Sequence, residues 1–338
     1  HINNYNIVLY LGKYVHWEDT IHGLKGKLEL HYWALDYDEV RARTQFLQSK
    51  SMLHCFEYWF GPYPFYDDSY KLVEAPHLGM EHQSAVAYGN HFKNGYLGRD
   101  LSGTGWGLKW DFIIIHESGH EWFANNITTK DIADMWVHEG FTNYSESLYT
   151  ECLFGKEAGN EYVYGTRKNI QNDIPIIGKY GVNNEGSGDM YYKSGNMIQA
   201  IRHIINDDAL FRSILTGLNK TFYHQTVTTG QVENYINKKS GIDFNKVFDQ
   251  YLRTTQIPTF HYYLSNDQRE ITFRWENCVP GFNMPLVFPK DQNQAALILK
   301  PTEEWQTIKL KNEELEFFTS DYIDKNYYVQ ISNVNPNF

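Results

Sequence analysis

The pattern of hydrophobic and polar positions changes twice along the chain and divides it into three stretches. From Tyr5 to about Leu35 apolar and polar residues alternate, as at Leu28, Leu30 and Tyr32. This period of two predicts strands with one face against a core and one face toward water. The stretch is too short to form a domain by itself.

From about Asp38 to about Thr255 the apolar residues take a helical spacing. A first helix is predicted to end at Gly61-Pro62, and its apolar positions are Val40, Phe46, Leu47, Leu53, Phe56 and Phe60. A second apolar stripe consists of Met197, Ile198, Ile201, Ile204 and Ile205. Thr228 and Gln231 predict a capping box that opens a further helix. The middle of the chain is therefore expected to be mostly α-helical.

After Pro258 the alternation returns, most clearly where Ile271, Phe273 and Trp275 interleave with polar residues, and again around Tyr327. This pattern predicts a small β-sandwich over the last part of the chain.

Composition and charge narrow the choice of partners. The chain has 338 residues, of which 42% are hydrophobic and 21% charged, so it is expected to fold into a compact core. Its 30 Lys+Arg against 41 Asp+Glu give a net charge of −11, which argues against nucleic acid and anionic membranes as partners. No apolar run approaches the length that a transmembrane segment needs. The sequence leaves the oligomeric state open.

The cysteine spacing and the first residues give further expectations about cross-links and processing. Cys55, Cys152 and Cys278 are about a hundred residues apart and form no CxxC pair, which argues against a disulfide framework and against a cysteine zinc site. The first six residues contain no initiator Met and no signal pattern, so we expect a processed or excised piece of a longer protein. That interpretation favours an extracytoplasmic location, periplasmic or secreted.

The strongest chemical motif is His116-Glu117-Ser118-Gly119-His120, which fits HExxH within a stretch predicted to be helical from near Asp111. Residues i and i+4 share one helix face, so both imidazoles can bind one metal ion. Glu117 lies one step around the helix, where its carboxylate can reach a water on that metal. The motif therefore predicts a zinc site with Glu117 as general base.

A catalytic zinc needs a third protein ligand, and Glu139, eighteen residues past His120, is the candidate. Glu139 lies off the apolar stripe of its predicted helix, on a face with Asn143 and Glu146. Imidazole ligands usually donate their second N–H to an outer acceptor, and Asn143 or Glu146 are the nearest candidates.

Three motifs in one order carry a family resemblance. HExxH with Glu139, Gly79-Met80-Glu81-His82 upstream and Tyr191-Tyr192-Lys193 downstream together resemble the gluzincin aminopeptidases, the family of aminopeptidase N and the leukotriene hydrolase/aminopeptidase. The resemblance covers roughly the middle stretch of the chain. It implies one Zn²⁺ per chain and peptide substrates with a free N-terminus.

By this resemblance Glu81 binds the free α-amino group of the substrate, and Met80 borders the pocket for the first side chain. Gly79 permits close approach of the backbone, which suits an ammonium anchor at a fixed distance from the metal. The chain departs from the family motif at Leu78, where Gly is usual, and at His82, where Asn is usual.

The downstream motif implies a tyrosine that stabilises the oxyanion. Alignment on Lys193 assigns this role to Tyr191, and Tyr192 is the alternative if Ser194 shifts the register. A phenol that donates a hydrogen bond to developing negative charge lowers the barrier by about 3 kcal/mol.

The resemblance also implies the domain organisation. Residues 1–37 are expected to be the last strands of a truncated N-terminal all-β domain, residues 38–256 a thermolysin-like catalytic domain, and residues 257–338 a β-sandwich. The predicted fold class is thus α+β, with a mostly helical zinc-peptidase domain.

The function expected from the residues and the resemblance is a zinc aminopeptidase that hydrolyses the N-terminal peptide bond by metal-activated water. One alternative is a thermolysin-like endopeptidase, which lacks the amine anchor. Another is a catalytically silent zinc-containing protein that binds peptides or acts as a scaffold.

Overall fold

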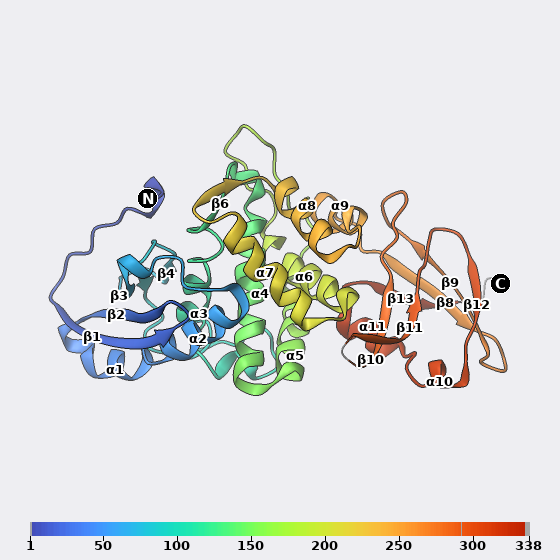
Figure 1. The fold of residues 1–338 in the computed structure, drawn as a ribbon, viewed down its shortest axis with the longest axis horizontal. Helices are drawn as coiled ribbons and strands as arrows, with labels where there is room; N and C mark the ends of the chain where they lie inside the picture. Colours follow the sequence, from blue (N-terminus) through green and yellow to red (C-terminus); the bar gives the residue numbers. More distant parts are fainter. Residues whose placement is uncertain (1, 292, 335–338) are drawn as a thin grey trace.

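The computed structural model describes residues 2–291 and 293–334. Figure 1 shows three regions that follow one another along the long axis in chain order: a sheet, a helical middle and a second group of strands. This α+β arrangement agrees with the three hydrophobic patterns. The outer ends of the predicted first and last stretches, residues 1 and 335–338, lie outside the described residues.

The first region is a five-stranded sheet of order β1-β2-β3-β5-β4. Its strands are β1 (Tyr14–Gly23), β2 (Gly26–Leu35), β3 (Tyr70–Glu74), β4 (Gly79–Met80) and β5 (Val86–Tyr88). β1 and β2 form an antiparallel hairpin, β2 is parallel to β3, and β3 is parallel to β5. Leu28, Leu30 and Tyr32 are buried, as their alternation predicts. The sheet therefore continues across the predicted domain boundary at residue 37.

The sequence predicted strands from Tyr5 onward, and this start is wrong. Asn4–Asn6 form a short 3₁₀ turn, and β1 begins only at Tyr14. Leu9 and Leu11, which lie in the stretch predicted to pack one face against a core, are 78% and 83% exposed. Alternation alone was misleading here, because it does not show whether a core is available for the apolar side.

Helices form the middle region. They are α1 (Glu39–Gln45), α2 (Gln48–Phe60), α3 (Phe112–Gly119), α4 (Trp136–Phe154), α5 (Lys156–Thr166), α6 (Tyr192–Ile205), α7 (Asp208–Thr221), α8 (Thr229–Ser240) and α9 (Asn245–Arg253). Two short parallel strands, β6 (Ile127–Thr129) and β7 (Gln225–Val227), pair beside them. The capping box of Thr228 and Gln231 opens α8, as predicted.

The first predicted helix is in fact two. α1 ends at Gln45, and α2 ends at Phe60 before Gly61, whose φ is +91°. Val40 and Leu47 are exposed, so they do not belong to the apolar stripe assigned to them. The core-facing positions Phe46, Leu53 and Phe56 kept the helical period recognisable across the break.

A disulfide between Cys55 on α2 and Cys152 on α4 corrects the prediction from the cysteine count. The two residues are 97 positions apart in sequence, but their Cα atoms lie 6.1 Å apart. The pairing results from the packing of α2 against α4, which cysteine spacing alone does not reveal. Cys278 is the free cysteine.

The C-terminal region contains a four-stranded sheet of order β12-β9-β8-β13 and a two-stranded sheet of β10 and β11. Its elements are β8 (Thr259–Leu264), β9 (Glu270–Glu276), β10 (Leu286–Asp291), β11 (Gln294–Leu299), β12 (Gln306–Lys309), α10 (Asn312–Leu315), α11 (Ser320–Asn326) and β13 (Gln330–Asn333). Ile271, Phe273 and Trp275 of β9 are buried, as predicted.

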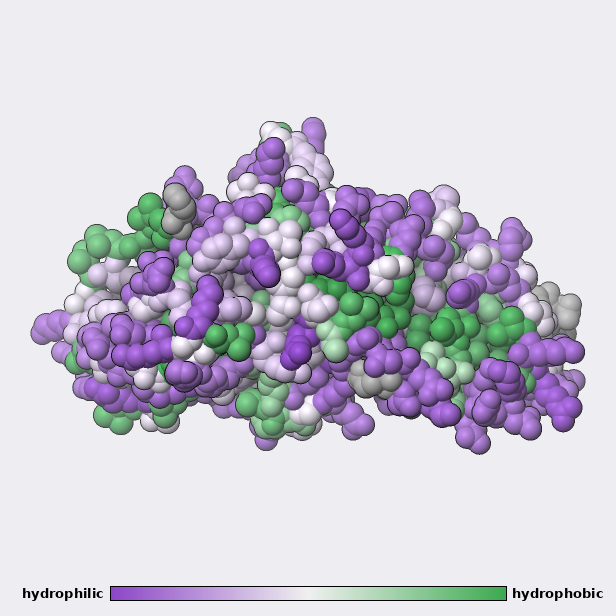
Figure 2. Space-filling model, in the orientation of Figure 1, coloured by the Kyte–Doolittle hydropathy of each residue, from purple (hydrophilic) through white to green (hydrophobic). Residues whose placement is uncertain are grey.

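The surface is mostly hydrophilic on the face drawn in Figure 2, with a hydrophobic area where the helical region meets the C-terminal strands. Among the described residues, no helix is both long enough and apolar enough to cross a membrane.

Candidate active site

The helix that carries HExxH is fixed at its first turn by a buried carboxylate. Asp111 caps α3, and its side chain accepts hydrogen bonds from the backbone N–H groups of Ile113 and Ile114. The same carboxylate accepts the hydroxyl of Tyr88 at 2.7 Å and the amide of Asn90 at 2.8 Å. Burial raises the pKa of Asp111 to about 6. These contacts tie the start of α3 to β5 and the loop that follows it.

α3 and α4 bring two imidazoles and a carboxylate together. His116 Nε2 and His120 Nε2 each lie 3.4 Å from Glu139 Oε2. A tetrahedral ion with bonds of about 2.1 Å separates its ligand atoms by about 3.4 Å. Glu139 Oε2 is buried and has no hydrogen-bond partner in the described structure. The donor set, its spacing and this unpaired oxygen all fit zinc.

Glu146 orients His116 from the side away from the cluster. His116 Nδ1 lies 2.8 Å from Glu146 Oε1, and the Tyr162 hydroxyl donates to the other oxygen of Glu146 at 2.7 Å. Asn143 donates to Glu146 Oε1 at 3.2 Å. Of the two outer acceptors predicted for the imidazoles, Glu146 contacts a histidine directly and Asn143 acts on Glu146.

His120 has different outer partners, which the sequence did not indicate. Its Nδ1 lies 3.0 Å from the carbonyl oxygen of Phe123 and 3.1 Å from Thr142 Oγ1. Both arrangements leave Nε2 of the two imidazoles directed to Glu139. A carbonyl acceptor depends on the path of the backbone after α3 and carries no residue signature.

Glu117 and Glu81 form the second part of the site. Each contributes a ligand atom to a group with His120 in which these atoms lie within 4.8 Å of one another. Burial raises the pKa of Glu117 to about 7, against the opposing effect of His116 and His120. The backbone oxygen of Glu81 accepts a hydrogen bond from Asn125 Nδ2 at 2.8 Å, which holds this residue beside the end of α3.

Gly79 lets β4 approach the catalytic helix. A Cβ at this position would lie 2.8 Å from Glu117 Oε1 and 2.8 Å from Ile113 Cγ2, closer than side chains tolerate. Met80 follows it in β4, pairs with Ala87 of β5 and is partly exposed. Gly79 and Met80 of the predicted motif thus form the edge strand β4 next to Glu117, and Glu81 follows directly after it.

The structure distinguishes the two tyrosines that the sequence left open. Tyr191 precedes α6, and its ring centroid is 6.0 Å from that of His116. Burial and the neighbouring carboxylate of Glu139 raise the pKa of Tyr191 well above its ordinary value. Burial also raises the pKa of Tyr192, and the negative charge of Glu146 adds to this effect. Tyr191 is therefore the phenol beside His116, one of the candidate zinc ligands.

Comparison with known proteins gives the family. Residues 48–251, more than half of the chain, match the Peptidase family M1 domain. The chain belongs to peptidase family M1. M1 peptidases are zinc-dependent, which agrees with the donor set on α3 and α4.

Similar M1 proteins include three aminopeptidases. Probable aminopeptidase 1 of Sulfurisphaera tokodaii is 21% identical over 68% of this chain and 31% of its own length. Aminopeptidase B of Mus musculus is 25% identical over 44% of this chain and 26% of its own length. Aminopeptidase N of Lactobacillus helveticus is 24% identical over 60% of this chain and 26% of its own length. The chain thus spans less than a third of the length of these M1 relatives.

Two solved structures share the M1 fold. Legionella pneumophila aminopeptidase A in complex with aspartic acid matches with a TM-score of 0.68 at 14% identity, over 96% of this chain and 39% of that one. A two-domain M1 zinc metallopeptidase bound to L-tryptophan matches with a TM-score of 0.57 at 19% identity, over 71% and 52%. At these identities the likeness shows the fold.

One buried carboxylate beside the HExxH motif escaped the sequence analysis. Glu121 is fully buried, its Oε1 accepts the backbone N–H of Ser84 at 2.7 Å, and burial raises its pKa to about 8. Its position directly after the second His of HExxH was a usable signal.

Proposed function

We propose that this M1 chain is a zinc aminopeptidase that hydrolyses the first peptide bond of peptides with a free N-terminus. The observation that carries the proposal is the position of Glu81, whose carboxylate lies in one group with Glu117 and His120 within 4.8 Å. A carboxylate beside the general base can hold a substrate ammonium, and it then leaves space for one residue before the bond that is cut.

His116, His120 and Glu139 would hold one Zn²⁺ per chain, which supplies Lewis-acid polarisation of the scissile carbonyl and acidifies the attacking water. Glu117 accepts the proton of that water and delivers it to the leaving amine. With a pKa raised to about 7 by burial, this carboxylate can accept a proton and return it near neutral pH.

Tyr191 donates its hydroxyl proton in a hydrogen bond to the oxyanion. Its raised pKa keeps the phenol protonated, which a donor requires. Met80, the last residue of β4 and the residue directly before Glu81, would border the space for the first side chain.

The experiment compares Glu81→Gln with the unchanged protein on aminoacyl reporter substrates and on an N-acetylated peptide. Loss of a charge-assisted contact costs about 2–5 kcal/mol, so kcat/KM should fall by at least about 30-fold on free N-termini. Glu185→Gln, which changes an exposed carboxylate in a loop, is the matched control and should retain activity.

The two alternatives predict other outcomes. A thermolysin-like endopeptidase would cut the N-acetylated peptide as well as the free one, and Glu81→Gln would leave it unchanged. A silent peptide-binding scaffold would bind zinc without turnover of any reporter, with or without a chelator.

We also propose an oxidising compartment, periplasmic or extracellular, for this chain. The Cys55–Cys152 disulfide supports this, since disulfides persist outside the reducing cytosol. Thiol labelling of protein isolated without reductant should find Cys278 alone reactive, and three reactive thiols would contradict the proposal.

A further inference from the structure

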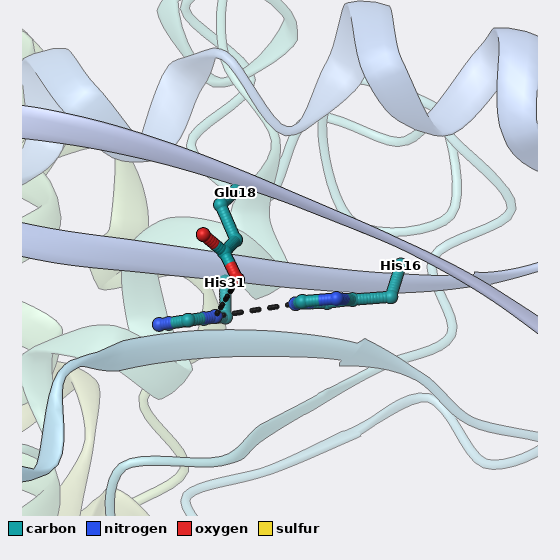
Figure 3. Close-up of side chains that lie close together, drawn as sticks. All are labelled: His16, Glu18 and His31. Carbon is teal, nitrogen blue, oxygen red and sulfur yellow. Dashed lines mark hydrogen bonds and ion pairs between the residues drawn. The ribbon is translucent and has the colours of Figure 1, made fainter.

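A second group of histidines lies on the β1–β2 hairpin, on the face that points to solvent. Leu28, Leu30 and Tyr32 fill the core side of β2, so the residues between them face outward. The strand register pairs Glu18 directly with His31, and His16 is one diagonal step away, opposite Trp33. Figure 3 shows the carboxylate of Glu18 above the facing edges of the two imidazoles.

The spacing of the donor atoms resembles that of the peptidase centre, which consists of His116, His120 and Glu139. His16 Nε2 lies 3.2 Å from His31 Nδ1, and Glu18 Oε1 lies 3.8 Å from the same His31 nitrogen. The three donor atoms lie within 4.8 Å of one another. A transition metal with bonds of about 2.0–2.2 Å requires ligand atoms about 3–3.5 Å apart, so small side-chain adjustments would close the site.

The neighbours of the cluster hold it in this geometry. The two imidazole planes differ by only 5°, and the indole of Trp33 stacks on His16 with ring centroids 4.4 Å apart. Glu29 Oε2 lies 3.9 Å from His31 Nε2, the nitrogen that faces away from the cluster. Glu29 thus lies on the far side of His31 as Glu146 lies on the far side of His116, but beyond the 2.8 Å hydrogen-bond distance of that pair.

We propose that His16, Glu18 and His31 form a second metal site, for a divalent transition ion of the Zn²⁺ type. Two imidazoles and one carboxylate suit Zn²⁺, Ni²⁺ or Cu²⁺ and are a poor set for Mg²⁺ or Ca²⁺. Water completes the coordination, because Glu18 and His16 are exposed. The ion links β1, which forms the edge of the sheet opposite β4, to β2. The proposal is independent of peptidase activity.

The test counts zinc equivalents. The full chain, stripped of metal by a chelator, is titrated with Zn²⁺ against a chromophoric competitor. The unchanged protein should bind two equivalents, one tight at the peptidase centre and one weaker. His16→Gln and His31→Gln should each abolish the weaker equivalent, and Glu139→Ala should instead remove or weaken the tight one by at least 10-fold.

His22→Gln is the matched control, since this residue lies on the same face of β1, opposite Lys27. It should leave two equivalents, and a large excess of Mg²⁺ should not displace the weaker one. A single equivalent in the unchanged protein would overturn the proposal, as would a weaker equivalent that survives both His substitutions or disappears in His22→Gln. Circular dichroism checks the fold, and Glu18→Gln, which should weaken the second equivalent, provides a further test if a His variant unfolds.

Discussion

At the scale of single residues, Glu117 differs from Glu139, the proposed zinc ligand, in the direction of its pKa shift. The imidazoles of His120 and His116 lower the pKa of Glu139 well below its ordinary value, overcoming the opposing effect of burial. For Glu117 burial prevails, and the pKa rises to about 7. The carboxylate of Glu139 is therefore suited to remain charged and bind a cation. The carboxylate of Glu117 is suited to exchange a proton.

Replacing Glu117 with Gln should lower kcat by about 10²–10⁴-fold while the zinc content is unchanged, since only the general base is removed. In the unchanged protein the rate should fall as the pH decreases through the pKa of Glu117, because a protonated carboxyl cannot accept the water proton. Burial raises this pKa to about 7, and a bound dication would lower it from that value. Steady-state kinetics and metal analysis on the same samples check both. Retained turnover would contradict the mechanism.

Replacing Glu146 with Ala should weaken zinc binding by about 10–100-fold, because the imidazole of His116 loses the partner that orients it. Asn143→Ala should have a smaller effect, since it contacts Glu146 and no histidine in the described structure. Competition with a chromophoric chelator measures both. Unchanged affinity in both variants would show that this pair does not support the metal.

The juxtaposition of His116 and His120 could be predicted from the sequence because i, i+4 spacing on one helix places two imidazoles on one face. The partner of His120 could not, since a backbone oxygen of Phe123 looks like any other in a sequence. Tyr191 and Tyr192 could be separated only by the turn before α6, which directs one ring toward His116.

At the scale of elements, the site depends on how closely the short strand β4 approaches α3. The two elements contact each other at Gly79. The carboxylate of Glu117 occupies the space that a side chain at this position would need. The strand is only two residues long and pairs with β5 on one side. Its position is therefore fixed by neighbours more than by its own hydrogen bonds.

Gly79→Ala should lower kcat/KM by about 10–100-fold with zinc content unchanged, because the added methyl group displaces Glu117 or β4 by a fraction of an ångström. Gly230→Ala in α8 is the control, since an added Cβ there meets nothing within 4 Å. Activity equal to that of the unchanged protein in Gly79→Ala would show that the approach is not critical.

Elements with strong local signals were predicted well. The Thr228 and Gln231 box opens α8 as expected, and Asp111 caps α3 close to the predicted start. The break between α1 and α2 was not predicted, because the apolar spacing continues through Phe46 and the backbone change at this point has no Gly or Pro. Periodicity reports which face is buried and says little about where a helix is interrupted.

At the scale of the whole molecule, links between distant parts of the chain were beyond sequence reasoning. The hairpin of β1 and β2 joins β3 in one sheet, so its role as the end of an upstream domain stays a prediction. The division at residue 256 likewise stays a prediction. The disulfide between α2 and α4 depended on tertiary packing that no spacing rule describes.

Reduction of the Cys55–Cys152 disulfide, or Cys152→Ser, should lower the free energy of unfolding by about 2–4 kcal/mol, because the unfolded chain gains freedom when a long loop opens. Urea unfolding with and without reductant measures the difference. Cys278→Ser serves as the control, since this cysteine is free. Equal stability under both conditions would argue that the link adds nothing.

α4 carries a proposed zinc ligand near one end and a disulfide near the other. Glu139 lies in its first turn and Cys152 in its last, about 20 Å apart at the rise of an α-helix. The two ends of α4 should therefore respond to different agents. A chelator would remove the proposed metal from Glu139, and a reductant would open the disulfide at Cys152. Amide hydrogen exchange should then rise near Glu139 when a chelator is added and near Cys152 when a reductant is added.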